Sequence, residues 1–260
     1  STKDLIAAVL SRAGETVAPP GSFNNEIGHP YTVLRCTEDT DFLVAEMSAR
    51  GIGHIAHLAT IAPPTIGVVL NVGSAHIGEF GSRSNIARAK GELVEALPDS
   101  GVAVLNADDE LVAGMASRTQ ARVVTFSETG NTAADYFATD VELDAVARAS
   151  FTMHTPKGEP QRVELGVFGA HQVGNALAAA AVEGADDLEL VARVDVDDDL
   201  DAVEGIEYSA QAGAHDRMVV DKHDAKCHFP SKGSVAARTL PSTVISPPTS
   251  STRARSPFSP

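Results

Sequence analysis

The sequence contains no tryptophan, and aromatic residues make up only 5% of its 260 positions. The core must therefore be built mostly from Ala, Val, Leu and Ile, within an overall hydrophobic content of 43%. No apolar run approaches the roughly 20 residues of a membrane-spanning helix, and no signal peptide opens the chain. We therefore expect a cytoplasmic protein that does not engage a membrane. Separately, we expect a monomer.

Cysteine and basic residues are also scarce. The two cysteines, Cys36 and Cys227, form no CxxC pair, which is typical of free thiols in a reducing compartment. The sequence has 20 Lys and Arg residues but 35 Asp and Glu residues, which gives a formal net charge of −15. Nucleic-acid binders normally carry a basic footprint, so this charge argues against a nucleic-acid partner. An anionic small-molecule substrate remains compatible with it, because local cations, a metal or helix N-termini can bind an anion.

Hydrophobic periodicity predicts an α/β fold in the first part of the chain. Apolar strands alternate with amphipathic helices, a pattern typical of a mainly parallel sheet flanked by helices. The predicted strands are near-continuous apolar runs, as a sheet covered on both faces requires. The helices are predicted at 3–13, 53–62, 82–97 and 109–118, and the strands at 42–48, 66–73, 102–108 and 122–127. A small antiparallel subsheet of strands 137–143, 148–155 and 161–168 comes next, and then an Ala-rich helix over 169–184.

The pattern predicts three regions along the chain. Residues 1–185 form the α/β domain, 186–227 form an acidic irregular segment that is the remnant of a link between domains, and 228–260 form a tail. The tail is dominated by Ser, Pro and Thr, which bury too little apolar surface to fold, so we expect it to be disordered. The chain has no initiator Met and opens at a helix start, so we expect a preceding segment to be missing.

The stretch from Asn71 to Glu92 carries the strongest candidate site. It places His76 just beyond the predicted strand 66–73 and Lys90 on the next predicted helix, while Glu46 ends a neighbouring strand. Ligands of open α/β sheets bind beyond the carboxyl ends of the strands. Together these side chains suggest a metal and phosphate site.

Each of these residues also has an ordinary structural interpretation. Glu46 is either a metal ligand or an exposed acid at a strand end. A single loop histidine such as His76 is more often a surface or hydrogen-bonding residue than a metal ligand, because Mg²⁺ prefers oxygen. Lys90 is either a surface lysine with its stem along the helix, or a lysine held near a metal, where carbamylation would convert the cation into a carboxylate-like ligand.

Several polar residues elsewhere are candidates for ligand contacts. Asn24 and Asn25 are typical of a turn before a helix, and their amides could also bind a polar ligand. His171 and Asn175 lie four residues apart on one predicted helix face, which is either solvated or faces a purine. After the strand 102–108, Asp109 is expected to cap the next helix, which leaves Asn106 as a possible nucleotide contact. The sequence does not decide between these roles.

Taken together, several strings in this sequence resemble the Mur ligase family. Each string is short and weak alone, but all occur in the family's order and at its spacing. They are STKDL, GSFNNEIGHPYTVL, LVAEMSARGIGHI, VVLNVGSAHIGEFGS, ARAKGE, VLNADD and GAHQVGNALAAAA. They span residues 1–181, and NNEIG and AKGE favour the branch of the family that adds D-Ala-D-Ala to UDP-N-acetylmuramoyl-tripeptide in peptidoglycan precursor synthesis.

The resemblance implies a three-domain, ATP-dependent amide ligase of which this chain is the central, ATP-binding domain. ATP would phosphorylate the tripeptide carboxylate, and the amine of D-Ala-D-Ala would attack the acyl phosphate. STKDL matches the string directly after the family's phosphate loop, which ends in GKS or GKT, so that loop is absent from this sequence. The alternatives are a catalytically inactive remnant of such a ligase, or another family ligase such as folylpolyglutamate synthase.

The resemblance also implies roles for particular residues. The metal site would use Glu46 and His76 as Mg²⁺ ligands and carbamylated Lys90 to hold a second Mg²⁺. Asn24 and Asn25 would lie toward the UDP-sugar peptide. The ATP site would involve Asn106, His171, Asn175 and Arg217, the last of which resembles an Arg that reaches the nucleotide from the link to the C-terminal domain.

Overall fold

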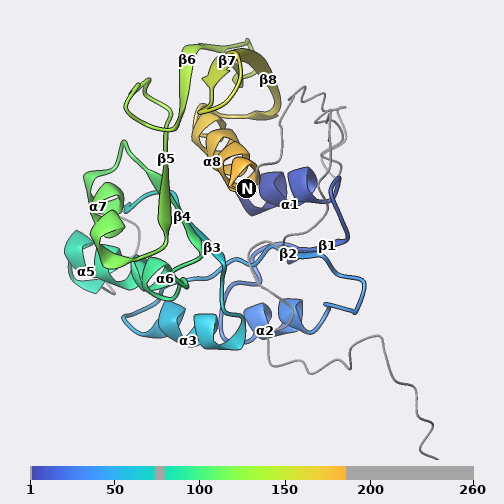
Figure 1. The fold of residues 1–260 in the computed structure, drawn as a ribbon, viewed down its shortest axis with the longest axis vertical. Coiled ribbons are helices and arrows are strands. Elements are labelled where there is room, and N and C mark those ends of the chain that lie inside the picture. Colours follow the sequence, from blue (N-terminus) through green and yellow to red (C-terminus); the bar gives the residue numbers. More distant parts are fainter. Residues whose placement is uncertain (1, 74–79, 186–260) are drawn as a thin grey trace, which may run out of the picture. The chain divides into compact units, whose positions relative to one another are not determined.

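The computed structural model describes residues 2–73 and 80–185, whose arrangement is shown in Figure 1. All of them belong to one compact unit of the chain. The predicted linking segment and tail, 186–227 and 228–260, lie outside the described residues.

Strands and helices alternate as the periodicity predicts. The helices are α1 (Thr2–Leu10), α2 (Gly28–Val33), α3 (His54–Ile61), α5 (Arg83–Lys90), α6 (Glu92–Glu95), α7 (Glu110–Ala113), the 3₁₀ helix η1 (Gly114–Arg118) and α8 (Gln172–Gly184). The strands are β1 (Thr16–Val17), β2 (Phe42–Leu43), β3 (Ile66–Val69), β4 (Val102–Asn106), β5 (Arg122–Ser127), β6 (Tyr136–Leu143), β7 (Arg148–His154) and β8 (Gln161–Phe168).

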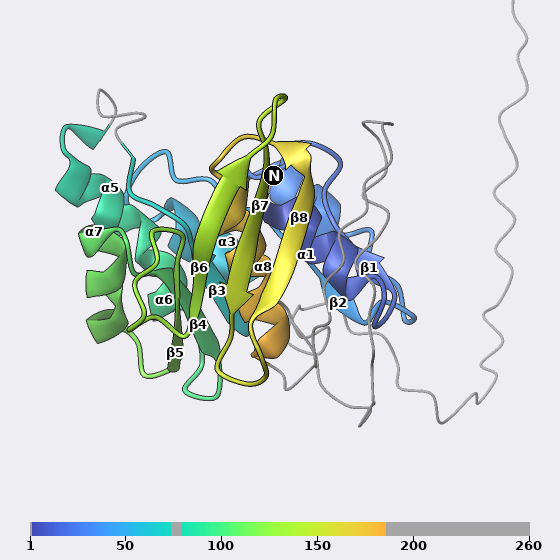
Figure 2. The same ribbon diagram turned by 90° about the horizontal axis from the view of Figure 1, so that it is seen from above.

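Six of these strands form one sheet in sequence order, β3-β4-β5-β6-β7-β8. The pairs from β3 to β6 are parallel, whereas β6-β7 and β7-β8 are antiparallel. Figure 2 shows the three long antiparallel strands side by side. The predicted mainly parallel sheet and antiparallel subsheet are confirmed, and the two are continuous through the β5-β6 pair. Strands β1 and β2 form a separate parallel pair.

Helices cover both faces of the parallel part of the sheet. Figure 1 shows α5, α6 and α7 on one side of β3–β5 and α1 and α8 on the other. Side chains of β4 pack against the helices on both faces of the sheet, because successive side chains of a strand point to opposite faces. Val102 and Val104 pack in the core with α1 and α8, whereas Ala103 and Leu105 pack in the core with α5–α7. The strand is buried on both faces, which explains its continuous apolar run.

Helix α8 lies close to the sheet and to α1 because its facing side chains are small. Residues 178–181 are four consecutive alanines, and each has at most 4% of its surface exposed. The helix contacts every strand of the six-stranded sheet as well as α1. Within the described residues, no helix combines the length and hydropathy needed to cross a membrane.

Several predicted boundaries were wrong. The strand predicted at 42–48 is only the two-residue β2, because its partner β1 runs into Pro19 and Pro20, and proline has no N–H for a strand ladder. The strand predicted at 66–73 ends at Val69, where its pairing with β4 ends. The helix predicted at 82–97 is divided at Gly91 into α5 and α6, and the helix predicted at 109–118 becomes α7 and η1.

Candidate active site

A cavity of about 370 Å³ lies at the carboxyl end of β3. Its walls come from the start of α1, the segment between β2 and α3, and the α5–α6 region. Most lining side chains are apolar. The polar and charged exceptions are Thr2, Lys3, Glu46, Asn71 and Lys90. The structure therefore brings Glu46 and Lys90, which are 44 positions apart in sequence, to one site beyond a strand end.

Glu46 is held by one of the two asparagines that the sequence singled out. The Asn24 side-chain amide donates to Glu46 Oε1 at 2.6 Å, and the Asn24 carbonyl accepts from the Ser48 amide at 2.8 Å. Asn24 therefore orients the carboxylate directly. Asn25 has a different task, because its side-chain oxygen accepts from the amides of Ile27 and Gly28 at the start of α2.

Lys90 is the last residue of α5 and reaches back to the end of β3. Its ammonium donates to the Asn71 carbonyl at 2.6 Å. Burial lowers the pKa of the Lys90 ammonium from its usual range, and the nearby Asp109 carboxylate opposes that shift. The neutral amine is therefore more populated at a given pH than it is for a surface lysine. A neutral amine is the form that reacts with carbon dioxide or another electrophile.

A second lysine on the cavity was missed in the sequence. Lys3 lies on the first turn of α1 with only 9% of its surface exposed, and its ammonium pairs with the Asp4 carboxylate. A buried cation on a cavity wall is a suitable partner for an anionic ligand. The only sequence signal was its position within the STKDL string.

The segment after β3 is held by residues from the end of β4. The Asn106 amide donates to the Leu70 carbonyl at 2.9 Å, and its oxygen accepts from the Asp108 amide at 2.8 Å. Asp109 caps α7 as predicted, and its other carboxylate oxygen accepts from the Val72 amide at 2.7 Å. Asn106 thus has a structural role whether or not it contacts a nucleotide.

The start of α8 is joined to the start of α1. The Thr2 hydroxyl donates to Asn175 Oδ1 at 2.7 Å, and the Asn175 amide donates to Gln172 at 2.8 Å. His171 occupies the exposed N-cap position of the same helix. The structure therefore places His171 and Asn175 one turn apart at a helix N-terminus, near the part of α1 that lines the cavity.

Glu128 is a further residue at this helix start that sequence reasoning missed. Its carboxylate accepts from the Gly174 amide of α8 at 3.0 Å. Burial raises the pKa of Glu128 and the Asp108 charge adds to the rise, while the Gly174 amide and His171 oppose it. The contact spans 46 positions of sequence, so no local pattern could reveal it.

Two predicted site residues, His76 and Arg217, lie outside the described residues. Among the described residues, no three His, Cys, Asp or Glu side chains gather in a metal-binding cluster. The described cavity offers one carboxylate, Glu46, and Lys90 becomes an oxygen ligand only when carbamylated. These two residues fit Mg²⁺ in chemical type but form a complete site only with further ligands, so the metal remains a prediction.

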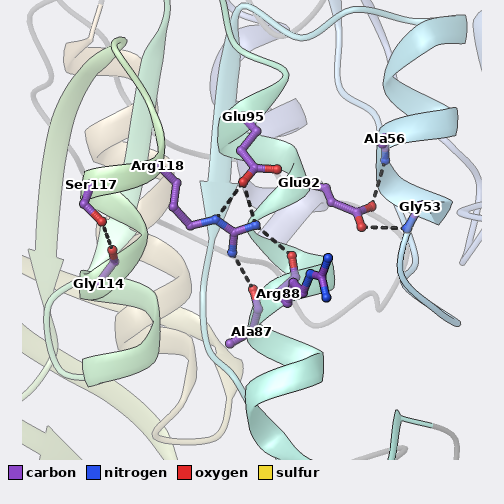
Figure 3. Close-up of polar contacts among 9 residues, drawn as sticks. All are labelled: Gly53, Ala56, Ala87, Arg88, Glu92, Glu95, Gly114, Ser117 and Arg118. Carbon is purple, nitrogen blue, oxygen red and sulfur yellow. Dashed lines mark hydrogen bonds and ion pairs between the residues drawn. The ribbon is translucent and has the colours of Figure 1, made fainter.

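A network of polar contacts supports the cavity wall behind Lys90. Figure 3 shows the Arg118 side chain, from η1, bound to carbonyls at the end of α5. It also shows the Glu92 carboxylate, from α6, bound to amides at the start of α3. The AKGE string contains Gly91 and Glu92, but the sequence indicated no role for either. Neither did it single out Arg118, whose partners lie 23 to 31 positions away.

The mainly parallel sheet with helices on both faces and the cavity at the end of β3 define an α/β domain with a cavity at the carboxyl edge of its sheet. The chain matches the Mur ligase middle domain over residues 1–183, and it belongs to the Mur ligase family. It is 61% identical over 182 residues to the UDP-N-acetylmuramoyl-tripeptide–D-alanyl-D-alanine ligase of Mycobacterium tuberculosis, covering 70% of this chain and 35% of that relative. The chain thus spans about a third of the length of the curated relatives that it matches at this identity.

Solved structures show the same relationship. A crystal structure of MurF from Acinetobacter baumannii superposes with a TM-score of 0.67 at 34% identity, covering 73% of this chain and 41% of the other. MurF from Thermotoga maritima in complex with ADP has a TM-score of 0.63 at 30% identity, covering 70% of this chain and 42% of the other. The predicted family and fold are confirmed.

Proposed function

We propose that this chain forms the central domain of an ATP-dependent ligase that adds D-Ala-D-Ala to UDP-N-acetylmuramoyl-tripeptide. One observation carries the proposal: Glu46 and Lys90 line one cavity at the end of β3, in a chain 61% identical to a relative named for that reaction. The same identity favours this reaction over that of folylpolyglutamate synthase. The proposed reaction transfers the ATP γ-phosphoryl group to the tripeptide carboxylate, after which the dipeptide amine displaces phosphate and forms an amide.

The charged residues of the cavity suit this chemistry. Both substrates of the first step are anions, so the site must offset their repulsion, as Lys3 can from the start of α1. Glu46, oriented by Asn24, supplies the carboxylate for a metal. Lys90, whose pKa is lowered by burial, supplies an amine that carbon dioxide converts to a carbamate with loss of a proton. When bound, Mg²⁺ would neutralise charge between the reacting anions.

The remaining binding roles are assigned from the positions of the candidate residues. His171 and Asn175 at the α8 start would border the adenine, with Asn106 nearby on the sheet edge and Arg217 reaching the nucleotide. Asn24 and Asn25 would face the UDP-sugar peptide, and His76 would complete the metal site with Glu46. A cytoplasmic location, a monomeric state and the lack of a nucleic-acid or membrane partner belong to the same proposal.

A domain exchange tests the function directly. Residues 1–183 of this chain would replace the matching segment of the M. tuberculosis relative, and phosphate release from ATP would be measured. We expect turnover that requires both UDP-N-acetylmuramoyl-tripeptide and D-Ala-D-Ala. The unaltered relative is the positive control, and omission of each substrate is the negative control.

The same experiment separates the proposal from an inactive remnant. A folded chimera that releases no phosphate, measured beside an active parent enzyme, would show that this domain has lost its catalytic competence. A chimera that accepts a different amine in place of D-Ala-D-Ala would assign it to another reaction of the family.

A further inference from the structure

The end of helix α5 is bound by a side chain from another element. Lys90 is the last residue of α5, and the final carbonyls of a helix lack intrahelical partners. The Arg118 guanidinium binds this helix end, because Nη2 donates to the Arg88 carbonyl at 2.9 Å. Its Nη1 donates at 3.0 Å to the Ala87 carbonyl, which also accepts from the Gly91 amide. Figure 3 shows both contacts. A cation at this position also interacts favourably with the negative end of the helix dipole.

Arg118 is itself fixed by a carboxylate on the next helix. Its Nε donates to Glu95 Oε1 at 2.9 Å, so one guanidinium joins η1, the end of α5 and the end of α6. A planar guanidinium can serve several acceptors in fixed directions, whereas a lysine ammonium acts as a compact point charge. Lysine at position 118 would therefore keep the charge and lose the simultaneous contacts.

Gly91 leaves the space that Arg118 occupies. A Cβ atom built on Gly91 would lie 1.8 Å from Arg118 Nη1. The backbone of Gly91 is ordinary helix, with φ −69° and ψ −13°, so it places no demand for glycine. The three atoms nearest to that Cβ all belong to the Arg118 guanidinium, which therefore excludes a larger residue. An alanine at this position would displace the guanidinium without straining the backbone.

Glu92, the first residue of α6, binds the junction between α5 and α6 to the start of α3. Its carboxylate accepts from the amides of Gly53 at 2.6 Å and Ala56 at 3.1 Å, and so caps the start of α3. Helix α3 comes after the segment that carries Glu46. The α5–α6 junction is therefore anchored at the end of α5 by Arg118 and at the start of α3 by Glu92, and Lys90 lies at this junction.

We infer that Arg118 is a positioning residue for Lys90, which it holds at the cavity by fixing the last turn of α5. Fixing that turn keeps the Lys90 ammonium at the Asn71 carbonyl, 2.6 Å away, on the cavity wall. The importance of this role rests on the proposed function, because Lys90 matters chemically only if the cavity is the ligase site. The geometric part concerns this chain alone and is tested without ligase activity.

The test measures hydrogen exchange of the Lys90 ammonium by NMR in the complete chain labelled with ¹⁵N-lysine, at pH 6. The signal is assigned by its loss in Lys90→Arg. Two variants, Arg118→Lys and Gly91→Ala, remove the contacts of Arg118 by different routes. Their matched controls are Arg88→Lys, an exposed arginine on the same helix, and Gly114→Ala, where an added Cβ meets no atom within 4 Å.

We expect slow exchange in the wild type and both controls, and at least about tenfold faster exchange in Arg118→Lys and Gly91→Ala. The inference would be overturned if folded Arg118→Lys or folded Gly91→Ala exchanged its Lys90 ammonium hydrogens within about twofold of the wild-type rate. It would also be overturned if the wild-type Lys90 ammonium gave no signal protected from exchange. If Arg118→Lys does not fold, Gly91→Ala decides the question alone.

Activity provides a second, separable measurement. In an active chimera, Arg118→Lys should lower kcat about tenfold and leave KM for ATP nearly unchanged, because it displaces a reacting group and not a binding contact. An inactive chimera with altered Lys90 exchange would contradict the proposed function only. An active chimera with unaltered exchange would contradict only the role of Arg118.

Discussion

Lys90, which is partly buried, and Glu183, which is fully buried, are two titratable residues near helix ends, and their surroundings differ sharply. Lys90 lies on a cavity and donates to the Asn71 carbonyl. Glu183 lies in the last turn of α8 with 0% of its surface exposed, and neither carboxylate oxygen has a hydrogen-bond partner among the described residues. Burial lowers the pKa of Lys90 and raises that of Glu183 to about 8, against a weaker opposing effect of Arg12.

The comparison shows that a shifted pKa does not by itself mark a functional site. In both residues burial disfavours the charged form. At Lys90 the neutral form is an amine that faces space for a ligand, and Glu46 lies on the same cavity. At Glu183 the neutral form is a protonated acid fully buried without a hydrogen-bond partner among the described residues, where its consequence is a cost in stability. The open cavity and the second reactive group distinguish the two.

The largest effect is expected at the cavity, where replacing Glu46 should lower turnover. In the chimera, Glu46→Gln keeps an oxygen for the Asn24 amide but removes the negative charge. We expect at least about a 100-fold loss of turnover, since even outer-shell partners of a metal site cost about 10- to 100-fold when altered. The measurement is phosphate release, with melting temperature as the control for folding. Full turnover would remove Glu46 from the metal site.

Glu183→Gln should stabilise the protein at neutral and alkaline pH. The folded-state pKa of about 8 exceeds the ordinary 4.5, so the folded state binds more protons between these values and stability falls as pH rises through this window. The shift sets an upper bound of about 5 kcal/mol, and we expect a gain of roughly 1–3 kcal/mol at pH 8. Chemical denaturation at several pH values measures it.

The gain should vanish near pH 4, where both folded and unfolded forms of Glu183 carry their proton. The exposed Glu164 of β8 offers the matched control, since Glu164→Gln should leave the pH dependence of stability unchanged. An equal gain at pH 4 and pH 8 would contradict a buried, protonated Glu183.

Asp109→Ala should destabilise the fold by about 1–2 kcal/mol, because it removes the α7 cap and the contact with the Val72 amide. It should also lower the pKa of Lys90 further, since the Asp109 charge opposes the effect of burial. Urea denaturation and NMR titration of Lys90 measure the two effects. The exposed Asp99 is the control, and equal losses from Asp109→Ala and Asp99→Ala would argue against the cap.

The smallest effect is expected where α1 meets α8. Asn175→Ala removes the acceptor for the Thr2 hydroxyl, and a partly buried hydrogen bond contributes about 0.5–1.5 kcal/mol. Thermal unfolding measures this change. If Asn175 also borders the adenine, KM for ATP should rise in the chimera, whereas an unchanged KM would leave it with a structural role only.

The order of strands and helices was predictable because it depends on local periodicity. The apolar run of β4 and the Ala-rich run of α8 indicate their elements wherever the rest of the chain lies. The boundaries that were wrong depend on distant contacts or on partner strands. The short β1 limits β2, and Arg118 binds the end of α5 where the sequence predicted one continuous helix.

The candidate site was predictable to a similar extent. The position of Glu46 at a strand end and of Lys90 on the helix after the next strand, together with the family resemblance, predicted one site for both. The contact of Asn24 with Glu46, and that of Glu128 with α8, join residues 22 and 46 positions apart and depend on the folded arrangement alone. The spacing of residues along the sequence does not predict such contacts.

The most direct test of the cavity's role compares Lys90→Ala and Glu183→Gln in the same chimera by phosphate release with all three substrates present. We predict that Lys90→Ala abolishes turnover in a folded protein, whereas Glu183→Gln retains turnover within about twofold of the unmodified chimera. Retained turnover in Lys90→Ala, or its loss in a stably folded Glu183→Gln, would contradict the assignment of the cavity as the ligase site.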